Sequence, residues 1–266
     1  MHEDPTSAQH DLPFVQDDLQ GDPPTKSLHF ASWELQSRMR LDQPDALDVE
    51  YTRTMMGFLL FNSRPASIAM IGLGGGSLAK FCHRHLSESR IAVIEINPLV
   101  IALRDEFKVP RDSHRFQVIE GDGADYVAHA QQGVDVLLVD GFDGAGMPDR
   151  LATQAFYDHC QQALSPDGVM VVNLHVEHPQ YEVFIARIER SFGANVLKVP
   201  VKREGNNIVF ACNADLLEQQ RRSAARQAQW LDKVAWADLK PIWAQVADAL
   251  WRHHAGFPLG RNPACP

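Results

Sequence analysis

The sequence has few cysteines, no paired cysteine motif and no long hydrophobic run. Its four cysteines form no CxxC pair and no spacing typical of metal ligands; they are Cys82, Cys160, Cys212 and Cys265. We therefore expect free thiols in a reducing compartment and no bound metal. No apolar run approaches the about 18 residues that a membrane-spanning helix needs, and the N-terminus is too polar for a signal peptide. These absences predict a cytoplasmic protein without a membrane partner.

Basic residues are also in short supply. The chain has 25 Lys and Arg against 34 Asp and Glu, which gives a formal net charge of −9. Nucleic-acid binding needs clustered cations, so we do not expect a nucleic-acid partner. An acidic chain is compatible with a cationic substrate. With 266 residues, 45% of them hydrophobic, the chain can bury a full core.

Four apolar runs, each ending in glycines or acids, organise the middle of the chain. Residues 68–76 run from an apolar stretch into glycines, and residues 91–95 and 116–122 each end in an acid. Residues 134–143 end in two aspartates. Near-continuous apolar runs are typical of strands buried on both faces of a parallel sheet. Ligands of such sheets bind at the carboxyl ends of the strands, where these polar residues lie.

The chain is expected to have four parts. In order they are a disordered leader (1–27), an N-terminal β-ribbon and helix (28–62), a nucleoside-binding α/β domain (63–213) and a C-terminal helical tail (214–266). The last two predicted strands, 195–201 and 206–213, read as an antiparallel pair, and the tail reads as two helices broken near Pro241. The fold class predicted is a Rossmann-like α/β fold with a seven-stranded sheet of the S-adenosylmethionine-dependent methyltransferase type.

The glycines and the first acid favour a nucleoside site. Gly72, Gly74 and Gly76 follow a predicted strand and precede a helix, so that the backbone can approach a ligand closely and offer free N–H groups. Glu95 ends the next strand, where an acid can bind both hydroxyls of a ribose, whether of NAD or of S-adenosylmethionine. The structural alternatives are a tight turn without a ligand and a solvated acid.

The later acids have two interpretations each. Asp122, before Gly123, can accept a hydrogen bond from an adenine amino group or cap the next helix, and both roles can hold at once. Asp140 and Asp143 are close enough in sequence to repel, which raises one pKa or calls for a cation between them. A cationic amine would satisfy that, and one carboxylate could then take its proton. The alternative is a loop whose acids only turn the chain.

Together these residues resemble the spermidine synthases, the polyamine aminopropyltransferases, over about residues 30–210. The motifs that carry the resemblance are Gln36-Ser37, Glu50-Tyr51, Gly72–Gly76, Glu95-Ile96-Asn97, Gly121-Asp122-Gly123, Asp140-x-x-Asp143 and Phe156-Tyr157. The resemblance implies transfer of an aminopropyl group from decarboxylated S-adenosylmethionine to an amine. It implies that Glu95 binds the ribose, Asp122 the adenine, and Asp140 activates the amine. It also implies that Asp143 holds the polyamine, and that Gln36 and Tyr51 line its site.

The sequence departs from the family pattern at positions that bear on the substrate. Where the family has an Asp that holds the ammonium of the donor, this chain has Ser77. An Asp would attract that ammonium and repel the carboxylate of intact S-adenosylmethionine, so that with Ser77 the preference should largely disappear. Tyr51 is followed by Thr52 and Arg53 rather than by His and Glu, and Arg53 would disfavour a polycation.

We predict a transferase that alkylates an amine, with decarboxylated S-adenosylmethionine or S-adenosylmethionine as co-substrate and with no metal. The predicted donor-binding residues are Gly72, Gly74, Gly76, Ser77, Glu95, Asp122 and Gly123. Asp140 is the predicted catalytic residue, with Asp143, Tyr51 and Gln36 binding the amine. The alternatives are a small-molecule methyltransferase, a non-catalytic nucleoside-binding module that uses the Trp-rich tail for interaction and, more distantly, a nicotinamide dehydrogenase. A homodimer is possible for such a protein.

Overall fold

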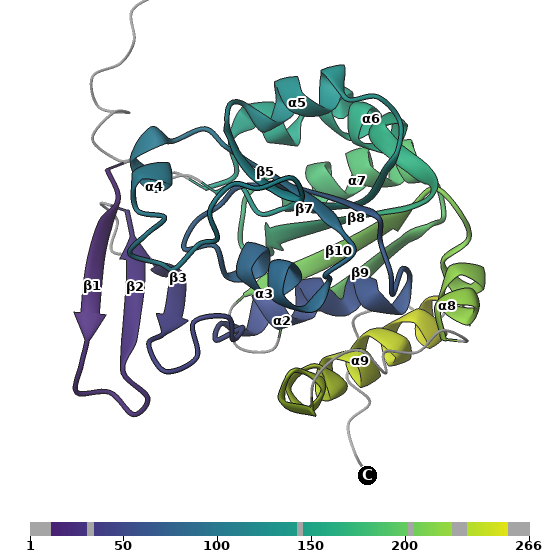
Figure 1. Cartoon of the computed structure of the whole chain (residues 1–266). Helices are drawn as coiled ribbons and strands as arrows, with labels where there is room; N and C mark the ends of the chain where they lie inside the picture. Colours follow the sequence, from purple (N-terminus) through teal and green to yellow (C-terminus); the bar gives the residue numbers. More distant parts are fainter. Residues whose placement is uncertain (1–11, 31–34, 143–145, 202–204, 225–232, 255–266) are drawn as a thin grey trace, which may run out of the picture.

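The computed structural model describes residues 12–30, 35–142, 146–201, 205–224 and 233–254. Within these ranges the chain forms a three-stranded sheet and a seven-stranded sheet, with helices on both faces of the larger one (Figure 1).

The small sheet consists of β1 (Phe14–Asp18), β2 (Thr25–His29) and β3 (Leu35–Arg40), paired antiparallel in that order. The antiparallel pairing of β2 with β3 confirms the predicted ribbon. The predicted leader of residues 1–27 is wrong for residues 14–18 and 25–27, which belong to strands.

Strand β1 escaped prediction because its residues are mostly polar and carry no apolar alternation. It is held instead by its partner, since all five of its residues pair with β2. An ion pair between Lys26 Nζ and Asp17 Oδ1, 3.0 Å apart, also joins the two strands. Stabilisation by a partner strand in this way leaves no apolar pattern in the strand itself.

The large sheet has the predicted seven strands. They are β4 (Ser67–Ile71), β5 (Arg90–Glu95), β6 (Phe116–Glu120), β7 (Val134–Val139), β8 (Leu164–His175), β9 (Val196–Pro200) and β10 (Asn206–Cys212). Their order is β6-β5-β4-β7-β8-β10-β9. The pairs from β6 to β8 are parallel, and β10 is antiparallel to both of its neighbours. This confirms the predicted Rossmann-like sheet with a closing hairpin.

Helices cover both faces of this sheet. They are α2 (Glu50–Met55), η1 (Met56–Leu60), α3 (Ser77–His85), α4 (Pro98–Ala102), α5 (Gly123–His129), η2 (Asp149–Ala152), α6 (Gln154–Ala163), α7 (Tyr181–Phe192), α8 (Leu216–Ala224) and α9 (Lys233–His254). In Figure 1, α5, α6 and α7 lie above the sheet, and α2, α3 and α9 lie below it. The buried hydrophobic residues form two clusters, and strand β4 contributes alternate side chains to each. Ile68 and Met70 belong to one cluster, and Ala69 and Ile71 belong to the other.

The C-terminal helix runs through Pro241, so the predicted break at that residue is wrong. Proline removes one backbone hydrogen bond and disfavours a continuous helix. Packing on both sides of the proline outweighs that cost, because Leu239, Trp243 and Val246 are buried in the main core. Trp236 packs against the same core. These tryptophans therefore hold the tail on its own body, and Trp230 lies outside the described residues.

Candidate functional site

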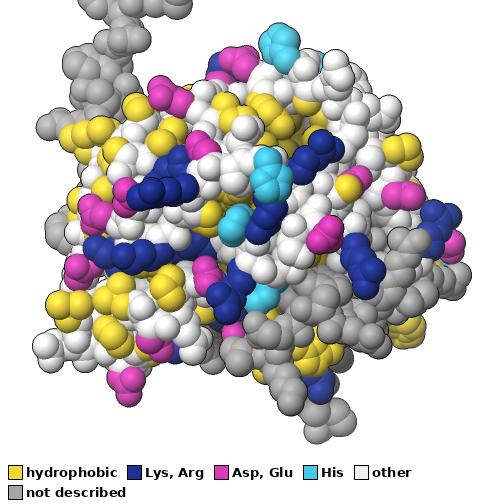
Figure 2. All heavy atoms as spheres, in the orientation of Figure 1, with side chains coloured by type: hydrophobic (Ala, Val, Ile, Leu, Met, Phe, Trp, Pro, Cys, Tyr) yellow, Lys and Arg dark blue, Asp and Glu magenta, His cyan; other side chains and the backbone are white. Residues whose placement is uncertain are grey.

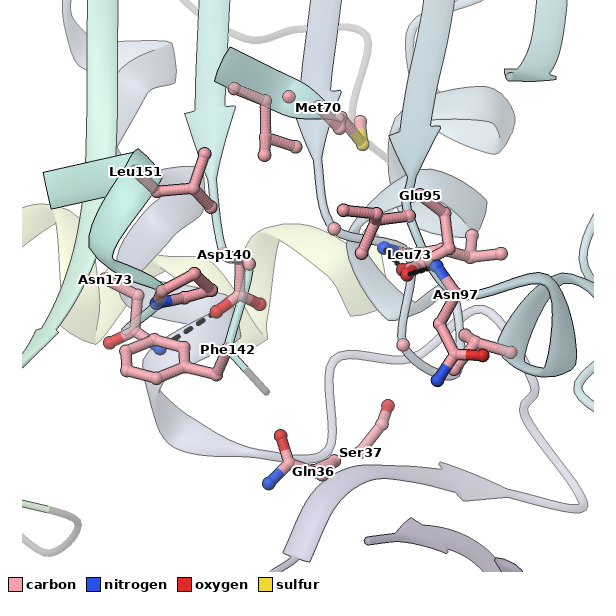
Figure 3. Close-up of a pocket in the computed structure, with 18 of the residues that line it drawn as sticks. Gln36, Ser37, Met70, Leu73, Glu95, Asn97, Asp140, Phe142, Leu151 and Asn173 are labelled. Carbon is pink, nitrogen blue, oxygen red and sulfur yellow. Dashed lines mark hydrogen bonds between the residues drawn. The ribbon is translucent and has the colours of Figure 1, made fainter. Parts of the chain in front are cut away.

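A cavity of about 1150 Å³ lies at the carboxyl ends of the parallel strands. Its walls come from β3, α2, the loops after β4, β5, β6 and β7, and the ends of β8 and β10. Figure 3 shows Gln36 and Ser37 on one side of the cavity, facing Asp140 and Glu95 on the other. The predicted residues that line it are Gln36, Tyr51, Gly72, Gly74, Ser77, Glu95, Asp122, Gly123 and Asp140. Asp143 lies outside the described residues.

The glycine loop after β4 has the conformation that its glycines permit. Gly72, Gly74 and Gly76 have φ angles of 95°, 50° and 68°, in a region that costs other residues strain. A Cβ on Gly72 would lie 2.2 Å from the backbone oxygen of Asp140. Gly76 is not part of the cavity wall; it is the N-cap of α3. The loop therefore brings the backbone of the predicted donor site into contact with the residue predicted to activate the amine.

Ser77 begins α3 and is buried, with 7% of its surface exposed. Its hydroxyl lies 3.3 Å from the hydroxyl of Ser37 on β3. Two uncharged hydroxyls thus meet on the cavity wall, at the position where the family resemblance implies a carboxylate in other members.

Glu95 joins two loops of the site. Its Oε2 accepts a hydrogen bond from the backbone N–H of Leu73 and its Oε1 accepts one from that of Asn97, both at 2.8 Å. Burial raises the pKa of the Glu95 carboxyl, and these backbone donors oppose the rise. Backbone N–H groups of Ile96 and Gly74 also bond to this carboxylate, which therefore holds the glycine loop in place at the cavity wall.

Glu95→Gln is expected to destabilise the fold as well as weaken nucleoside binding. A Gln side chain has one acceptor oxygen, so its NH₂ group would face the backbone N–H of Leu73 or Asn97, costing about 1–3 kcal/mol. Chemical denaturation should reveal that loss. The matched control is Glu120→Gln at the end of the neighbouring strand β6, which lies outside the cavity wall. Equal stability of the two variants would contradict the assigned role of Glu95.

Asp122 is the N-cap of α5, which is one of the two roles that the sequence predicted for it. Its Oδ1 accepts a hydrogen bond of 2.7 Å from the backbone N–H of Ala124. Its Oδ2 is ion-paired with Arg150, which also bonds to Asp125. Gly123 packs so closely on Ile71 that a Cβ would lie 2.3 Å from a methyl carbon of that side chain. The carboxylate of Asp122 is thus fixed at the cavity wall.

Asp140 follows β7 and is held by two neighbours. Tyr51 Oη donates to its Oδ2 at 3.1 Å, and Asn173 Nδ2 donates to its Oδ1 at 2.9 Å. Figure 3 shows Asn173 and Phe142 beside it. Burial raises the pKa of the Asp140 carboxyl, whereas the hydrogen bonds from Asn173 and Tyr51 lower it. A carboxylate with a raised pKa and oriented lone pairs is suited to accept a proton.

The sequence did not point to Asn173 or to Asn206, whose amide donates to Asn173. Both side chains are buried. The available signal was a lone polar residue within the apolar run of residues 169–174 and a polar start to the last strand.

The described cavity wall carries more acidic than basic side chains. The acids on the described wall are Glu95, Asp122, Asp140, Asp149 and Glu177, against the single arginine Arg150. On the face drawn in Figure 2, basic and acidic side chains are interspersed. Arg53 does not line the described part of the cavity; its guanidinium donates to the backbone oxygens of Leu47 and Asp48. The sequence-based argument that Arg53 disfavours a polycation is therefore not supported.

Within the described residues, no group of three or more His, Cys, Asp or Glu side chains comes together in a way that could hold a metal ion. In the same ranges, no helix is both long enough and apolar enough to cross a bilayer.

The strand order, the closing hairpin, the glycine loop and the acids at successive strand ends define a Rossmann-like fold of the S-adenosylmethionine-dependent methyltransferase class. The model of the spermine/spermidine synthase domain matches residues 48–201. The polyamine aminopropyltransferase of Chromobacterium violaceum is 43% identical over 187 residues, which cover 70% of this chain and 72% of that protein. The chain belongs to the spermine/spermidine synthase family, an enzyme family, as the sequence motifs predicted.

Solved structures give the same fold. A probable spermidine synthase from Corynebacterium glutamicum superposes with a TM-score of 0.68 at 19% identity, covering 83% of this chain and 93% of that one. Human methyltransferase-like protein 13, solved in complex with SAH, superposes with a TM-score of 0.57 at 24% identity, covering 81% and 96%. Transferases of two kinds thus share this architecture.

Proposed function

We propose that this enzyme transfers an aminopropyl group from decarboxylated S-adenosylmethionine to an amine. The observation that carries the proposal is the position of Asp140. It lies beside the backbone of the glycine loop, accepts hydrogen bonds from Tyr51 and Asn173, and belongs to a cavity wall rich in acidic side chains. The name of the Chromobacterium violaceum relative supports the same reaction. Gly72, Gly74, Glu95 and Asp122 would hold the nucleoside.

The chemistry requires little of the protein beyond positioning and proton removal. The amine nitrogen attacks the carbon bound to the sulfonium, the new N–C bond forms, and the electron pair of the broken C–S bond stays on sulfur. The protein must hold the reactants in line and keep the amine unprotonated. Asp140 would accept the proton. Gln36 and Tyr51 line the cavity, and we propose that they and Asp143 bind the amine.

Methyl transfer from intact S-adenosylmethionine is the second candidate. It is favoured by Ser77, whose hydroxyl meets only that of Ser37 among the described hydrogen bonds, and by the structural likeness to a methyltransferase. A non-catalytic module that works through its tail has less support, because Trp236 and Trp243 pack on the body of the protein. The cytoplasmic location and the homodimer stay predictions.

The decisive assay offers the purified protein both donors, one labelled in the aminopropyl group and one in the methyl group, with a panel of diamines. We expect labelled aminopropyl in the product. Labelled methyl would favour the second candidate, and binding without turnover of any amine would favour the non-catalytic module.

Ser77→Asp is expected to shift donor preference toward the decarboxylated form. A charge contact at about 4 Å is worth roughly 1–4 kcal/mol, or about 10- to 1000-fold in relative affinity. The measurement is the ratio of dissociation constants for the two donors by calorimetry. The control is Ser77→Asn, because Asn has the size of Asp but carries no charge. A ratio that stays at the wild-type value in Ser77→Asp would place the tail of the donor elsewhere.

A further inference from the structure

Two buried amide side chains connect strand β10 to Asp140. Asn173 lies near the end of β8 and Asn206 at the start of β10, with 3% and 5% of their surfaces exposed. Both reach the cavity wall. Burying a polar group costs free energy unless its hydrogen bonds are made, so the partners of these amides indicate what they do.

The hydrogen bonds form a directed chain. Asn206 Nδ2 donates to Asn173 Oδ1 at 2.8 Å, and Asn173 Nδ2 donates to Asp140 Oδ1 at 2.9 Å. Because the oxygen of Asn173 already accepts from Asn206, its NH₂ group is the one directed at Asp140. Without the Asn206 donor, the Asn173 amide could rotate by about 180° and place its oxygen next to the carboxylate. The two oxygens would then repel each other.

The backbone fixes the origin of this chain. Asn206 pairs with His175 across the antiparallel β10–β8 ladder, and its backbone oxygen accepts from the N–H of Val201 on the other side. The side chain that orients Asn173 is therefore anchored between two strands.

We propose that Asn206 is a positioning residue for the reaction, which sets the orientation of the Asn173 amide and thereby the direction and proton affinity of Asp140. The inference rests on the proposed role of Asp140 and adds a residue that does not touch the acceptor nitrogen. The consequence is electrostatic: the Asn173 bond favours the charged carboxylate and lowers the pKa of Asp140 against the effect of burial.

Other groups also act on Asp140 from different elements. Tyr51 on α2 donates to its second oxygen, and the charge of His175 at the end of β8 lowers its pKa. The hydrogen bond from Tyr51 does not involve Asn206, and His175, which pairs with Asn206 across the ladder, is itself unchanged by the substitution. A change in the titration of Asp140 would therefore report the amide chain.

The test compares Asn206→Leu and Asn206→Ala with Asn207→Leu as the matched control. Asn207 is the next residue on β10, points to the opposite face, and donates to Tyr181 Oη at 2.6 Å. The variants are compared in two ways: by titration of the Asp140 carboxyl with ¹³C-aspartate NMR, assigned with Asp140→Asn, and by kcat and KM. The NMR titration needs no turnover, so its result stands even if the proposed function fails.

For both Asn206 variants we expect the Asp140 ionisation equilibrium to shift about tenfold toward the protonated form, and kcat to fall about 10- to 100-fold with little change in donor affinity. The Asn207 variant should show neither change. An unchanged titration of Asp140 in either folded Asn206 variant would overturn the proposal. So would an equal shift in Asn207→Leu, since that would reflect general loosening of β10. If Asn206→Leu does not fold, Asn206→Ala decides.

Discussion

Replacing Asp140 by Asn is expected to lower kcat by about 10²- to 10⁴-fold while leaving the dissociation constant of the donor nearly unchanged. The substitution keeps the shape of the side chain and removes its ability to take a proton. An Asn can still accept from Asn173 Nδ2 and donate to Tyr51 Oη, so both hydrogen bonds of the site survive. The loss should therefore appear in turnover and not in folding.

The stability of this variant provides a second readout with a defined sign. Because burial raises the pKa of Asp140 in the folded protein, the ionised group is a cost to folding that appears as the pH rises through the unfolded and then the folded pKa. Asp140→Asn should thus unfold at a higher temperature than the wild type at neutral pH. That advantage should vanish below both pKa values, where Asp140 is uncharged in both states.

Asp135→Asn is the matched control. Asp135 lies at the opposite end of the same strand, where its Oδ2 accepts from the backbone N–H groups of Ala66 and Ser67 and its Oδ1 from Ser165 Oγ. This variant should lose stability and keep its turnover. Wild-type turnover in Asp140→Asn would remove Asp140 from the mechanism.

Gly72→Ala is expected to abolish donor binding and to destabilise the protein by more than about 3 kcal/mol. With φ at 95°, the added Cβ would lie 2.2 Å from the backbone oxygen of Asp140 and 3.1 Å from Cα of Gly141. Both are backbone atoms in the strand-end segment after β7, so they can move only if the loop does.

Gly74→Ala separates this clash from strain in the backbone. Gly74 has a positive φ of 50°, but a Cβ there would meet nothing closer than Ser37 Cβ at 3.8 Å. Its cost should be the left-handed conformation alone, roughly 1–2 kcal/mol. Chemical denaturation and calorimetric titration with the donor would compare the two. Similar binding by both variants would show that the close approach of Gly72 to Asp140 does not matter for the site.

Predictions from the sequence succeeded where a residue ends its own apolar run. This holds for the positions of Glu95, Asp122 and Asp140 on the cavity wall, because the carboxyl ends of parallel strands gather at one edge; their roles stay predictions. Asn173 and Asn206 were missed because their meeting depends on the register between β8 and β10 across 33 positions of sequence. Strand β1 was missed because its mostly polar residues carry no apolar alternation, although its partner β2 is the next strand in the chain.

A different error arose at Pro241. Local backbone preference predicted a break in the helix there, but the buried residues on both sides hold it together. Tertiary packing therefore outweighs the local preference of the proline, and a short stretch of sequence does not encode that packing.

The order of the strands has a consequence for how such an enzyme can diversify. Glu95 and Asp122 follow strands on one side of β4, whereas Asp140, Asn173 and Asn206 come from strands on the other side. The residues proposed to bind the nucleoside and those proposed to handle the amine thus come mainly from different halves of the sheet, which meet where Gly72 approaches the backbone of Asp140 and where Arg150 pairs with Asp122. On the proposed assignment, a new acceptor would call for substitutions on the β7 side of the sheet and at Gln36 and Tyr51, with the nucleoside-binding half retained.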